Sequence, residues 1–239
     1  MPFVIRSYPR CGTHMLRTAL DAHPEITCHN EIFNPDVTPP EKLAEIGAEE
    51  LYRRHASGKC EGFVVHGYTE LEAFAEVGRH AELWDFLERE KPTLFVVERE
   101  DLLRRAFSVY QARKTQRWHV WKSNVGENKL GVPEVPPVAV EWQLKCAVYS
   151  KRASRERFPW AEFYTYEQIV DDWDQQIAKM QRSIGVSTII PIKPKTAKQD
   201  QRPIHEMVSN YRYLKDYFAR SEWGKWFEVA EQNDERRAV

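Results

Sequence analysis

The fold is decided by the stretch Phe3-Val4-Ile5-Arg6-Ser7-Tyr8-Pro9-Arg10-Cys11-Gly12-Thr13-His14-Met15-Leu16. A short apolar run passes into a tight turn with proline and glycine, and then at once into a helical pattern. In such a connection the N–H groups of the turn and the helix N-terminus point to one place, where they bind an anion. Arg10 adds a positive charge inside the turn, and Thr13 adds a hydroxyl group in the first helical turn. The stretch therefore predicts a phosphate-binding loop that holds the 5′ end of an activated nucleotide.

The composition predicts one domain over residues 1–239, because 239 residues with 42% hydrophobic content can bury a full core. The 35 basic and 36 acidic residues give a net charge of −1, which does not favour a nucleic-acid partner. Four cysteines without a CxxC pair (Cys11, Cys28, Cys60 and Cys146) indicate neither a disulfide framework nor a zinc site, and they favour a reducing compartment.

Two further features concern the location of the protein. The first apolar run begins at residue 3, so we expect no signal peptide. No run of apolar residues is long enough to cross a bilayer, so we expect no integral membrane association. Together with the cysteine pattern, these features predict a cytoplasmic protein.

Short strands alternate with longer helices along the chain. The predicted strands cover residues 3–5, 62–66, 93–97 and 163–165, and the predicted helices cover 13–22, 41–54, 70–90, 100–114, 138–155, 167–184 and 204–218. This alternation predicts an α/β protein with a P-loop-like three-layer fold, in which helices flank a short central parallel sheet. Ligands of such sheets bind beyond the carboxyl ends of the strands, where the Pro9–Thr13 turn and the region of Arg99 are expected.

Arg99 ends the strand pattern Val96-Val97-Glu98 and is followed by Glu100-Asp101. A guanidinium group at the end of a buried strand needs an anion, because an unpaired buried charge is costly. That anion is either a neighbouring carboxylate, Glu98 or Asp101, or the phosphate of a ligand. Ser108, on the next predicted helix, could donate its hydroxyl group to the same anion. Taken alone, the stretch favours an intramolecular ion pair and a solvated Ser108.

The loop at residues 8–13 is not a Walker loop, because the pattern GxxxxGK[ST] is absent. It has one glycine and no lysine after that glycine, so it would surround fewer phosphate groups than an ATP-binding loop does. An ordinary strand–turn–helix connection without a ligand is the other interpretation of this stretch.

Taken together, these stretches resemble the sulfotransferases. The segment Ser7-Tyr8-Pro9-Arg10-Cys11-Gly12-Thr13-His14-Met15-Leu16 resembles their 5′-phosphosulfate loop, whose usual form is Y-P-[KR]-S-G-T-x-x-L. Val97-Glu98-Arg99 through Ser108 resembles their 3′-phosphate site, and Tyr164-Thr165-Tyr166-Glu167 resembles their late Y-E dipeptide. Thr115-Gln116-Arg117-Trp118-His119 is similar to the T-x-x-W-H stretch of the bacterial trehalose-type branch. The resemblance follows the chain in order from about residue 3 to residue 218.

The resemblance implies transfer of a sulfuryl group from 3′-phosphoadenosine-5′-phosphosulfate (PAPS) to a hydroxyl group or an amine, without a metal. The acceptor would be a small molecule, a sugar or a lipid. The loop residues that would bind the 5′ end of the donor are Arg10, Cys11, Gly12, Thr13 and His14. Arg99 and Ser108 would bind the 3′-phosphate, and Lys198, in the basic segment 195–202, would cover the adenosine end.

The acceptor also needs a base. The segment His23-Pro24-Glu25-Ile26-Thr27-Cys28-His29-Asn30-Glu31-Ile32-Phe33 resembles the family pattern H-P-x-I-x-x-x-x-E-x-F, which implies Glu31 as the catalytic base. His29 is the rival candidate, because the intrinsic pKa of histidine suits proton transfer near neutral pH. Polar side chains in a surface turn are the interpretation without a catalytic role.

Two departures from the family pattern leave other functions open. Cys11 replaces the usual serine and offers only a weak S–H donor, and Val64 stands where many relatives carry a lysine. The alternatives are a P-loop nucleotide kinase and a non-catalytic nucleotide-binding protein of the same fold. An exposed face of the predicted helix around residues 211–218 also suggests a homodimer.

Overall fold

The computed structural model describes residues 2–34, 36–56, 58, 60–66, 79–118, 131–188, 192–194, 200 and 202–238. The chain forms two compact units, of which the first comprises Met1–Glu98 with Ser150–Lys195 and the second Arg99–Tyr149 with Thr196–Val239. The single domain expected for residues 1–239 stays a prediction.

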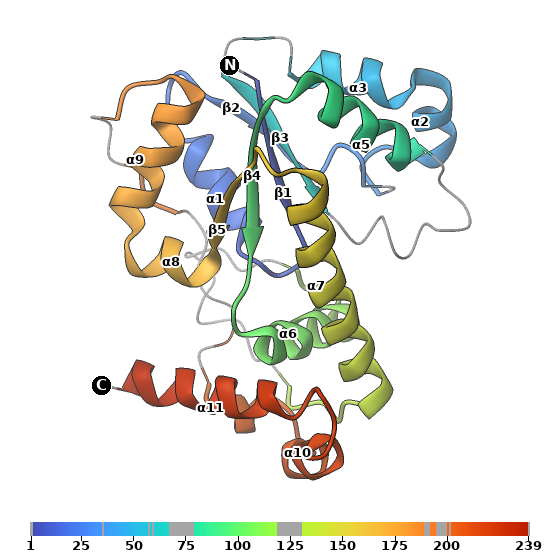
Figure 1. Cartoon of the computed structure of the whole chain (residues 1–239), viewed down its shortest axis with the longest axis vertical. Coiled ribbons are helices and arrows are strands. Elements are labelled where there is room, and N and C mark those ends of the chain that lie inside the picture. Colours follow the sequence, from blue (N-terminus) through green and yellow to red (C-terminus); the bar gives the residue numbers. More distant parts are fainter. Residues whose placement is uncertain are drawn as a thin grey trace. The chain divides into compact units, whose positions relative to one another are not determined.

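The first unit is built on a sheet of five parallel strands in the order β2-β3-β1-β4-β5 (Figure 1). The strands are β1 (Phe3–Ser7), β2 (Thr27–His29), β3 (Glu61–His66), β4 (Thr93–Glu98) and β5 (Glu162–Thr165). β1 lies in the middle, and its last residue, Ser7, is in register with His66 of β3 and with Val97 of β4. The phosphate loop predicted after β1 therefore starts at the centre of the sheet, as expected for a parallel α/β fold.

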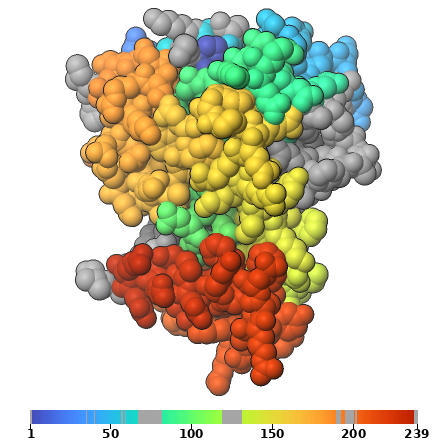
Figure 2. Space-filling model, viewed as in Figure 1, coloured from blue at the N-terminus to red at the C-terminus, as the bar shows by residue number. Residues whose placement is uncertain are grey.

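Helices cover both faces of this sheet (Figure 1). The helices α1 (Thr13–Leu20), α8 (Tyr166–Asp171) and α9 (Trp173–Ile184) lie on one side, and α2 (Pro40–Ile46), α3 (Ala48–His55) and α5 (Arg79–Glu90) lie on the other. Figure 2 shows α8 and α9, in orange, side by side on the surface of this unit. The side chains of β1 alternate between the two faces, so Val4 packs in the core below α2, α3 and α5. The predicted α/β fold with a central parallel sheet is thus confirmed.

Arg6 is a buried cation in the middle of β1. Its guanidinium carbon lies 5.1 Å from the ring centre of Trp84 on α5 and 5.5 Å from that of Phe158. Its Nη1 donates a hydrogen bond to the hydroxyl group of Ser154 on α7 (Pro137–Arg157). These cation–π and hydrogen-bonding contacts fix the C-terminal part of α7 to the strand that leads into the loop.

The second unit is helical. Its elements are α6 (Leu102–Thr115), the first part of α7, the 3-10 helix η2 (Ile204–Glu206), α10 (Tyr211–Phe218) and α11 (Lys225–Ala238). They enclose a core that contains Phe107, Leu144 and Leu214. Asp234 of α11 accepts hydrogen bonds from Arg104 on α6 and from the backbone of Ile204. This carboxylate therefore joins three separate segments of the unit.

Several element predictions were wrong in detail. The helix expected over residues 41–54 is two helices, because Gly47 takes a backbone φ of 84° and interrupts the helix. The helix expected over residues 167–184 is likewise divided at Asp172 into α8 and α9. The helix expected over residues 204–218 consists of η2 and α10, and it is not the last, because α11 follows. The short strand β2 was not predicted, although it carries the chain toward Glu31.

Candidate functional site

The loop after β1 has the backbone of an anion-binding turn. Arg10 and Gly12 both have positive φ angles, 69° and 82°, and these two left-handed residues frame Cys11. Gly12 is the N-cap of α1, and glycine has no side chain that could cap this helix end through a hydrogen bond. The N–H groups in the first turn of α1 therefore suit an anion at the carboxyl end of β1. Strained backbone at a non-glycine residue such as Arg10 is typical of functional loops.

Tyr166 packs directly against this loop. A β-carbon placed on Gly12 would lie 2.5 Å from Cδ2 of the Tyr166 ring, and at this distance the two carbon atoms clash. Tyr166 is held in place because it begins α8, whose N-terminus is closed by reciprocal hydrogen bonds between Thr165 and Gln168. Gly12 is thus required twice, once for its left-handed backbone and once for the aromatic ring beside it.

We therefore expect Gly12→Ala to weaken the binding of adenosine 3′,5′-bisphosphate by at least about tenfold. The left-handed conformation alone costs a non-glycine residue about 1–2 kcal/mol, and displacement of the ring adds to this cost. Isothermal titration calorimetry measures the affinity. The matched control is Gly47→Ala, because Gly47 also has a φ of 84°, while a β-carbon added there would meet no described atom within 4 Å. If Gly12→Ala bound adenosine 3′,5′-bisphosphate with unchanged affinity, the result would contradict the assignment of this loop to the binding site.

The predicted loop side chains lie in a strongly cationic environment. Burial, together with the positive charges of Arg17 and Arg10, lowers the pKa of His14 to about 4, although Glu31 acts in the opposite direction. His14 is therefore neutral at physiological pH, and the fixed positive charge of the loop comes from the arginines. Cys11 and Thr13 are both buried, with 2% and 6% of their surfaces exposed.

Glu31 occupies the end of a hydrogen-bonded chain that crosses three strands. Its Oε1 lies 2.8 Å from Nε2 of His66, and Nδ1 of His66 lies 3.2 Å from the hydroxyl oxygen of Ser7. The other oxygen of Glu31, Oε2, accepts a hydrogen bond of 2.9 Å from Asn34. The sheet order explains the arrangement: Ser7 ends β1, His66 ends β3 beside it, and Glu31 follows β2 on the far side of β3. The carboxylate predicted as base thus lies at the same ends of the strands as the phosphate loop.

His29, the rival candidate for the base, contacts a residue of α3. Its ring meets that of His55 on α3 edge to face, with 5.0 Å between the ring centres. Burial and, to a smaller extent, His55 lower the pKa of His29. The structure therefore places Glu31 near His14 at the start of α1, whereas His29 packs against α3. His29 stays the alternative prediction.

The carboxylates considered as partners of Arg99 bind other cations. Glu98, the last residue of β4, accepts a hydrogen bond of 2.8 Å from Arg155 and lies 3.3 Å from Nζ of Lys151. Asp101 caps α6 by accepting a hydrogen bond of 3.0 Å from the backbone N–H of Arg104. Arg99 itself is buried, and it directly follows the carboxyl end of the strand beside β1.

Ser108 belongs to α6 within the second unit. It is half-buried, in a stretch of the helix whose residues from Leu102 to Phe107 are all buried. Lys198 lies outside the described residues. Arg202, from the same predicted basic segment, is held by Asp200 through an ion pair of 2.7 Å.

Sequence reasoning did not identify the contact between His66 and Glu31. The signal was available in part, because His66 is the last residue of a predicted strand and Ser7 closely follows another one. The contact between His66 and Glu31 depends on strand β2, which brings Glu31 beside β3. β2 has only three residues of mixed polarity, and these residues do not predict a strand. Val64, the other departure from the family pattern, is buried in β3.

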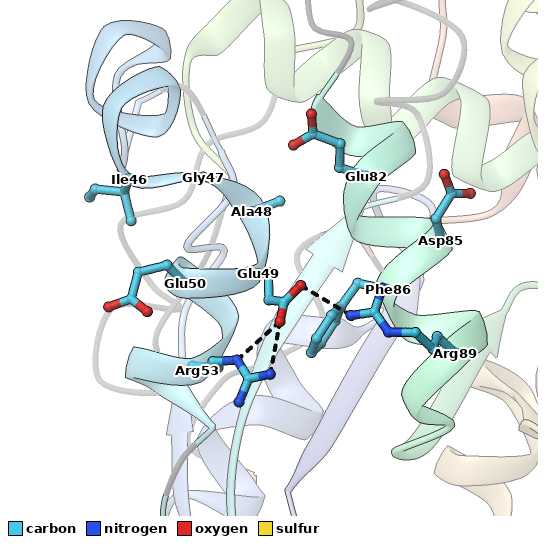
Figure 3. A pocket seen from close by; sticks show the side chains of 10 residues that line it. All are labelled: Ile46, Gly47, Ala48, Glu49, Glu50, Arg53, Glu82, Asp85, Phe86 and Arg89. Carbon is cyan, nitrogen blue, oxygen red and sulfur yellow. Dashed lines mark hydrogen bonds and ion pairs between the residues drawn. The ribbon is translucent and has the colours of Figure 1, made fainter.

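A hollow of about 590 Å³ lies elsewhere in the first unit, beside α3 and α5 (Figure 3). Three of its charged side chains bind one another: Glu49 accepts hydrogen bonds from Arg53 at 2.8 Å and from Arg89 at 3.0 Å. The predicted site residues do not line it. This hollow therefore differs from the candidate site at the strand ends.

Neither a metal cluster nor a membrane-spanning helix is found in the part of the chain that the structure describes. Within it, no three histidine, cysteine, aspartate or glutamate side chains are grouped so as to hold a metal ion. None of its helices has the length and apolar composition needed to cross a bilayer.

Comparisons with known proteins agree with this architecture. No family model matches the chain. It is 25% identical over 253 residues to Nodulation protein H of Rhizobium meliloti (strain 1021), and the match covers 96% of each chain. A second Nodulation protein H from Rhizobium meliloti is also 25% identical, over 257 residues and 96% of each chain.

Two solved structures share the fold. A sulfotransferase from Alicyclobacillus acidocaldarius superposes with a TM-score of 0.53 at 17% identity, covering 91% of this chain and 90% of that one. The mouse sulfotransferase SULT7A1, complexed with PAP, superposes with a TM-score of 0.50 at 16% identity, covering 95% of this chain and 88% of that one. The likeness to the sulfotransferases that the sequence motifs predicted is confirmed in the fold.

Proposed function

We propose that this chain, which has the sulfotransferase fold, transfers a sulfuryl group from PAPS to a hydroxyl group or an amine. One observation carries the proposal: a carboxylate, Glu31, and a loop with Arg10 and Gly12 follow the carboxyl ends of β2 and β1, two parallel strands that are separated only by β3. Transfer of an anionic group to a hydroxyl group needs both a cradle for the anion and an acceptor for the proton. The complex of the mouse sulfotransferase with PAP supports PAPS as the donor.

The loop serves the leaving group. The sulfur–oxygen bond to the 5′-phosphate breaks while the acceptor oxygen bonds to sulfur, so negative charge grows on the phosphate. Arg10 and the N–H groups at the start of α1 stabilise that charge, and they do so most in the transition state. Thr13 and His14 lie in the same turn, where we assign them to binding of the 5′ end.

Glu31 serves the acceptor. The acceptor O–H or N–H gives its proton to the Glu31 carboxylate as the new bond to sulfur forms. The two donors that Glu31 already has, His66 and Asn34, fix the carboxylate in one orientation. Such orientation brings the reacting groups together before the reaction begins.

Arg99 and Ser108 are assigned to the 3′-phosphate of the donor. This assignment follows the resemblance, and the burial of Arg99 directly after the carboxyl end of β4 is consistent with it. A 3′-phosphate distinguishes PAPS from ATP, so these residues would also select the donor. The role of Lys198 at the adenosine end stays a prediction from the resemblance. A homodimer, the cytoplasmic location and the lack of a nucleic-acid partner stay predictions from composition and local sequence patterns.

The acceptor is proposed only by class, as a small molecule, a sugar or a lipid. A P-loop nucleotide kinase is not favoured, since the loop lacks a lysine after Gly12 and the solved structures that superpose are sulfotransferases. Cys11, a weak donor in the loop, is the feature that favours a nucleotide-binding protein without turnover.

Calorimetry with adenosine 3′,5′-bisphosphate and with ATP tests the donor site. We expect the bisphosphate to bind at least about tenfold more tightly than ATP, and Arg99→Ala to weaken it about tenfold to a hundredfold, as for the loss of hydrogen bonds to a charged group. Arg212→Ala, which removes an exposed arginine of α10, is the matched control and should leave the affinity unchanged. Preference for ATP would overturn the proposed function, and an unchanged Arg99 variant would overturn the 3′-phosphate assignment.

A further inference from the structure

His66 has both ring nitrogens engaged. Nε2 faces Oε1 of Glu31 at 2.8 Å, and Nδ1 faces the hydroxyl oxygen of Ser7 at 3.2 Å. An ionised carboxylate can only accept hydrogen bonds, so Nε2 must carry a hydrogen. In the neutral ring Nδ1 is then an acceptor, and the hydroxyl group of Ser7 is the donor that faces it. Ser7 is 2% exposed, so few other partners compete for its hydroxyl group.

This chain of contacts constrains the carboxylate that we assign as base. His66 donates to one oxygen of Glu31, and Asn34 donates to the other at 2.9 Å. A carboxylate held at both oxygens cannot rotate, and a carboxylate oxygen can accept more than one hydrogen bond. The side chain of Glu31 is 19% exposed, so an acceptor can reach it, whereas that of His66 is 9% exposed.

We propose that His66 is a positioning residue that holds Glu31 through its Nε2–H group, and that Ser7 sets the tautomer that makes this possible. The proposal rests on the proposed sulfuryl transfer. In that step the proton moves from the acceptor to Glu31, and His66 keeps its own proton. His66 is not the base itself, because its two ring nitrogens face Glu31 and Ser7 instead of an acceptor. The titratable group His14 interacts electrostatically with Glu31, and also with Arg17 and Arg10.

Substitution by leucine and by glutamine separates positioning from proton transfer. The side-chain amide of glutamine donates a hydrogen bond from a place close to Nε2 of histidine, but it cannot accept a proton. With PAPS and an acceptor found in a panel of small alcohols, sugars and glycolipids, His66→Leu should lower kcat by about tenfold to a hundredfold, as expected for a group that orients a reacting one. His66→Gln should restore most of that loss. Equal losses in the two variants would identify His66 as a base and overturn the proposal.

Ser7 gives a second, independent test. Ser7→Ala should lower kcat by about fivefold, because the ring can then place its hydrogen on Nδ1 instead of Nε2. In the His66→Gln background the same Ser7 change should have no further effect, since an amide has no tautomers; this non-additivity is the expected result. If the loss of kcat in the double variant were the product of the losses in the two single variants, the result would contradict the proposal that Ser7 sets the tautomer of His66. The affinity for adenosine 3′,5′-bisphosphate should stay the same in all these variants.

NMR spectroscopy can determine the tautomer of His66 without a measurement of enzymatic activity. In protein labelled with ¹⁵N at histidine, the His66 signals, assigned by their loss in His66→Gln, should show a hydrogen on Nε2 and none on Nδ1 in the wild type. Ser7→Ala should show a mixture of tautomers. A ring protonated at Nδ1 in the wild type would overturn the inference even if transfer is observed. Conversely, the Nε2–H tautomer without any acceptor-dependent release of bisphosphate would leave the geometry standing and refute the proposed function.

Discussion

Glu31→Gln is expected to lower kcat by about a thousandfold, a size typical of the loss of a general base. The amide keeps the shape of the side chain but cannot take the acceptor proton. Because Glu31 lies with His66 and Asn34 and not in the loop backbone, the affinity for adenosine 3′,5′-bisphosphate should be unchanged. The loss should appear in kcat and in kcat/KM to the same extent, as for an interaction made only in the transition state.

Two further variants complete this experiment. Glu25→Gln is the matched control, because Glu25 is an exposed carboxylate in the same segment, and it should keep full turnover. His29→Ala tests the rival base, and we expect it to keep most of the activity, since His29 packs against His55. Full turnover by Glu31→Gln, together with a large loss in His29→Ala, would move the role of base to His29.

Arg10→Gly is expected to lower kcat by about a hundredfold to a thousandfold, the size found when one donor to a developing negative charge is removed. Glycine is the informative replacement. Arg10 has a φ of 69°, which glycine adopts without strain, so the variant removes the charge and keeps the shape of the loop. An alanine at this position would add backbone strain and confuse the two effects.

The contribution of the charge is tested by Arg10→Lys, which keeps the charge but loses the planar fork of donors. We expect it to recover part of the lost turnover. Steady-state kinetics with PAPS should place most of the effect in kcat, since Arg10 acts on the charge that grows as the bond to sulfur breaks. If Arg10→Gly weakened donor binding alone and left kcat intact, Arg10 would be a binding residue without a part in the leaving-group step.

The sequence was sufficient to predict those parts of the fold that depend on local patterns. The apolar runs at β1, β3 and β4 indicated strands, and their alternation with longer helices indicated a parallel sheet. The proline and glycine of the loop indicated an anion site. Predictions of helix boundaries were wrong where a single backbone angle determines them. Gly47 has a φ of 84°, and the helix expected over this stretch is therefore interrupted there and forms two helices. The helix α11 (Lys225–Ala238) was not predicted.

The sequence was sufficient to predict residues of the candidate site, but not the contacts between them. Arg10, Gly12 and Glu31 are recognisable from local motifs. The link from Ser7 through His66 to Glu31 joins three strands that are far apart in the chain, and it follows from the order β2-β3-β1. The same holds for Tyr166, whose ring meets Gly12 although the two residues are far apart in sequence.

The position of β2 bears on how such proteins diversify. β2 has three residues, lies at the border of the sheet and, among the described strands, pairs with β3 alone. The segment after it can therefore change in length or composition over evolution without disturbing the pairing of the interior strands. Because Glu31 stands at the start of that segment, new acceptor preferences can arise next to the base while β1 and its loop stay as they are.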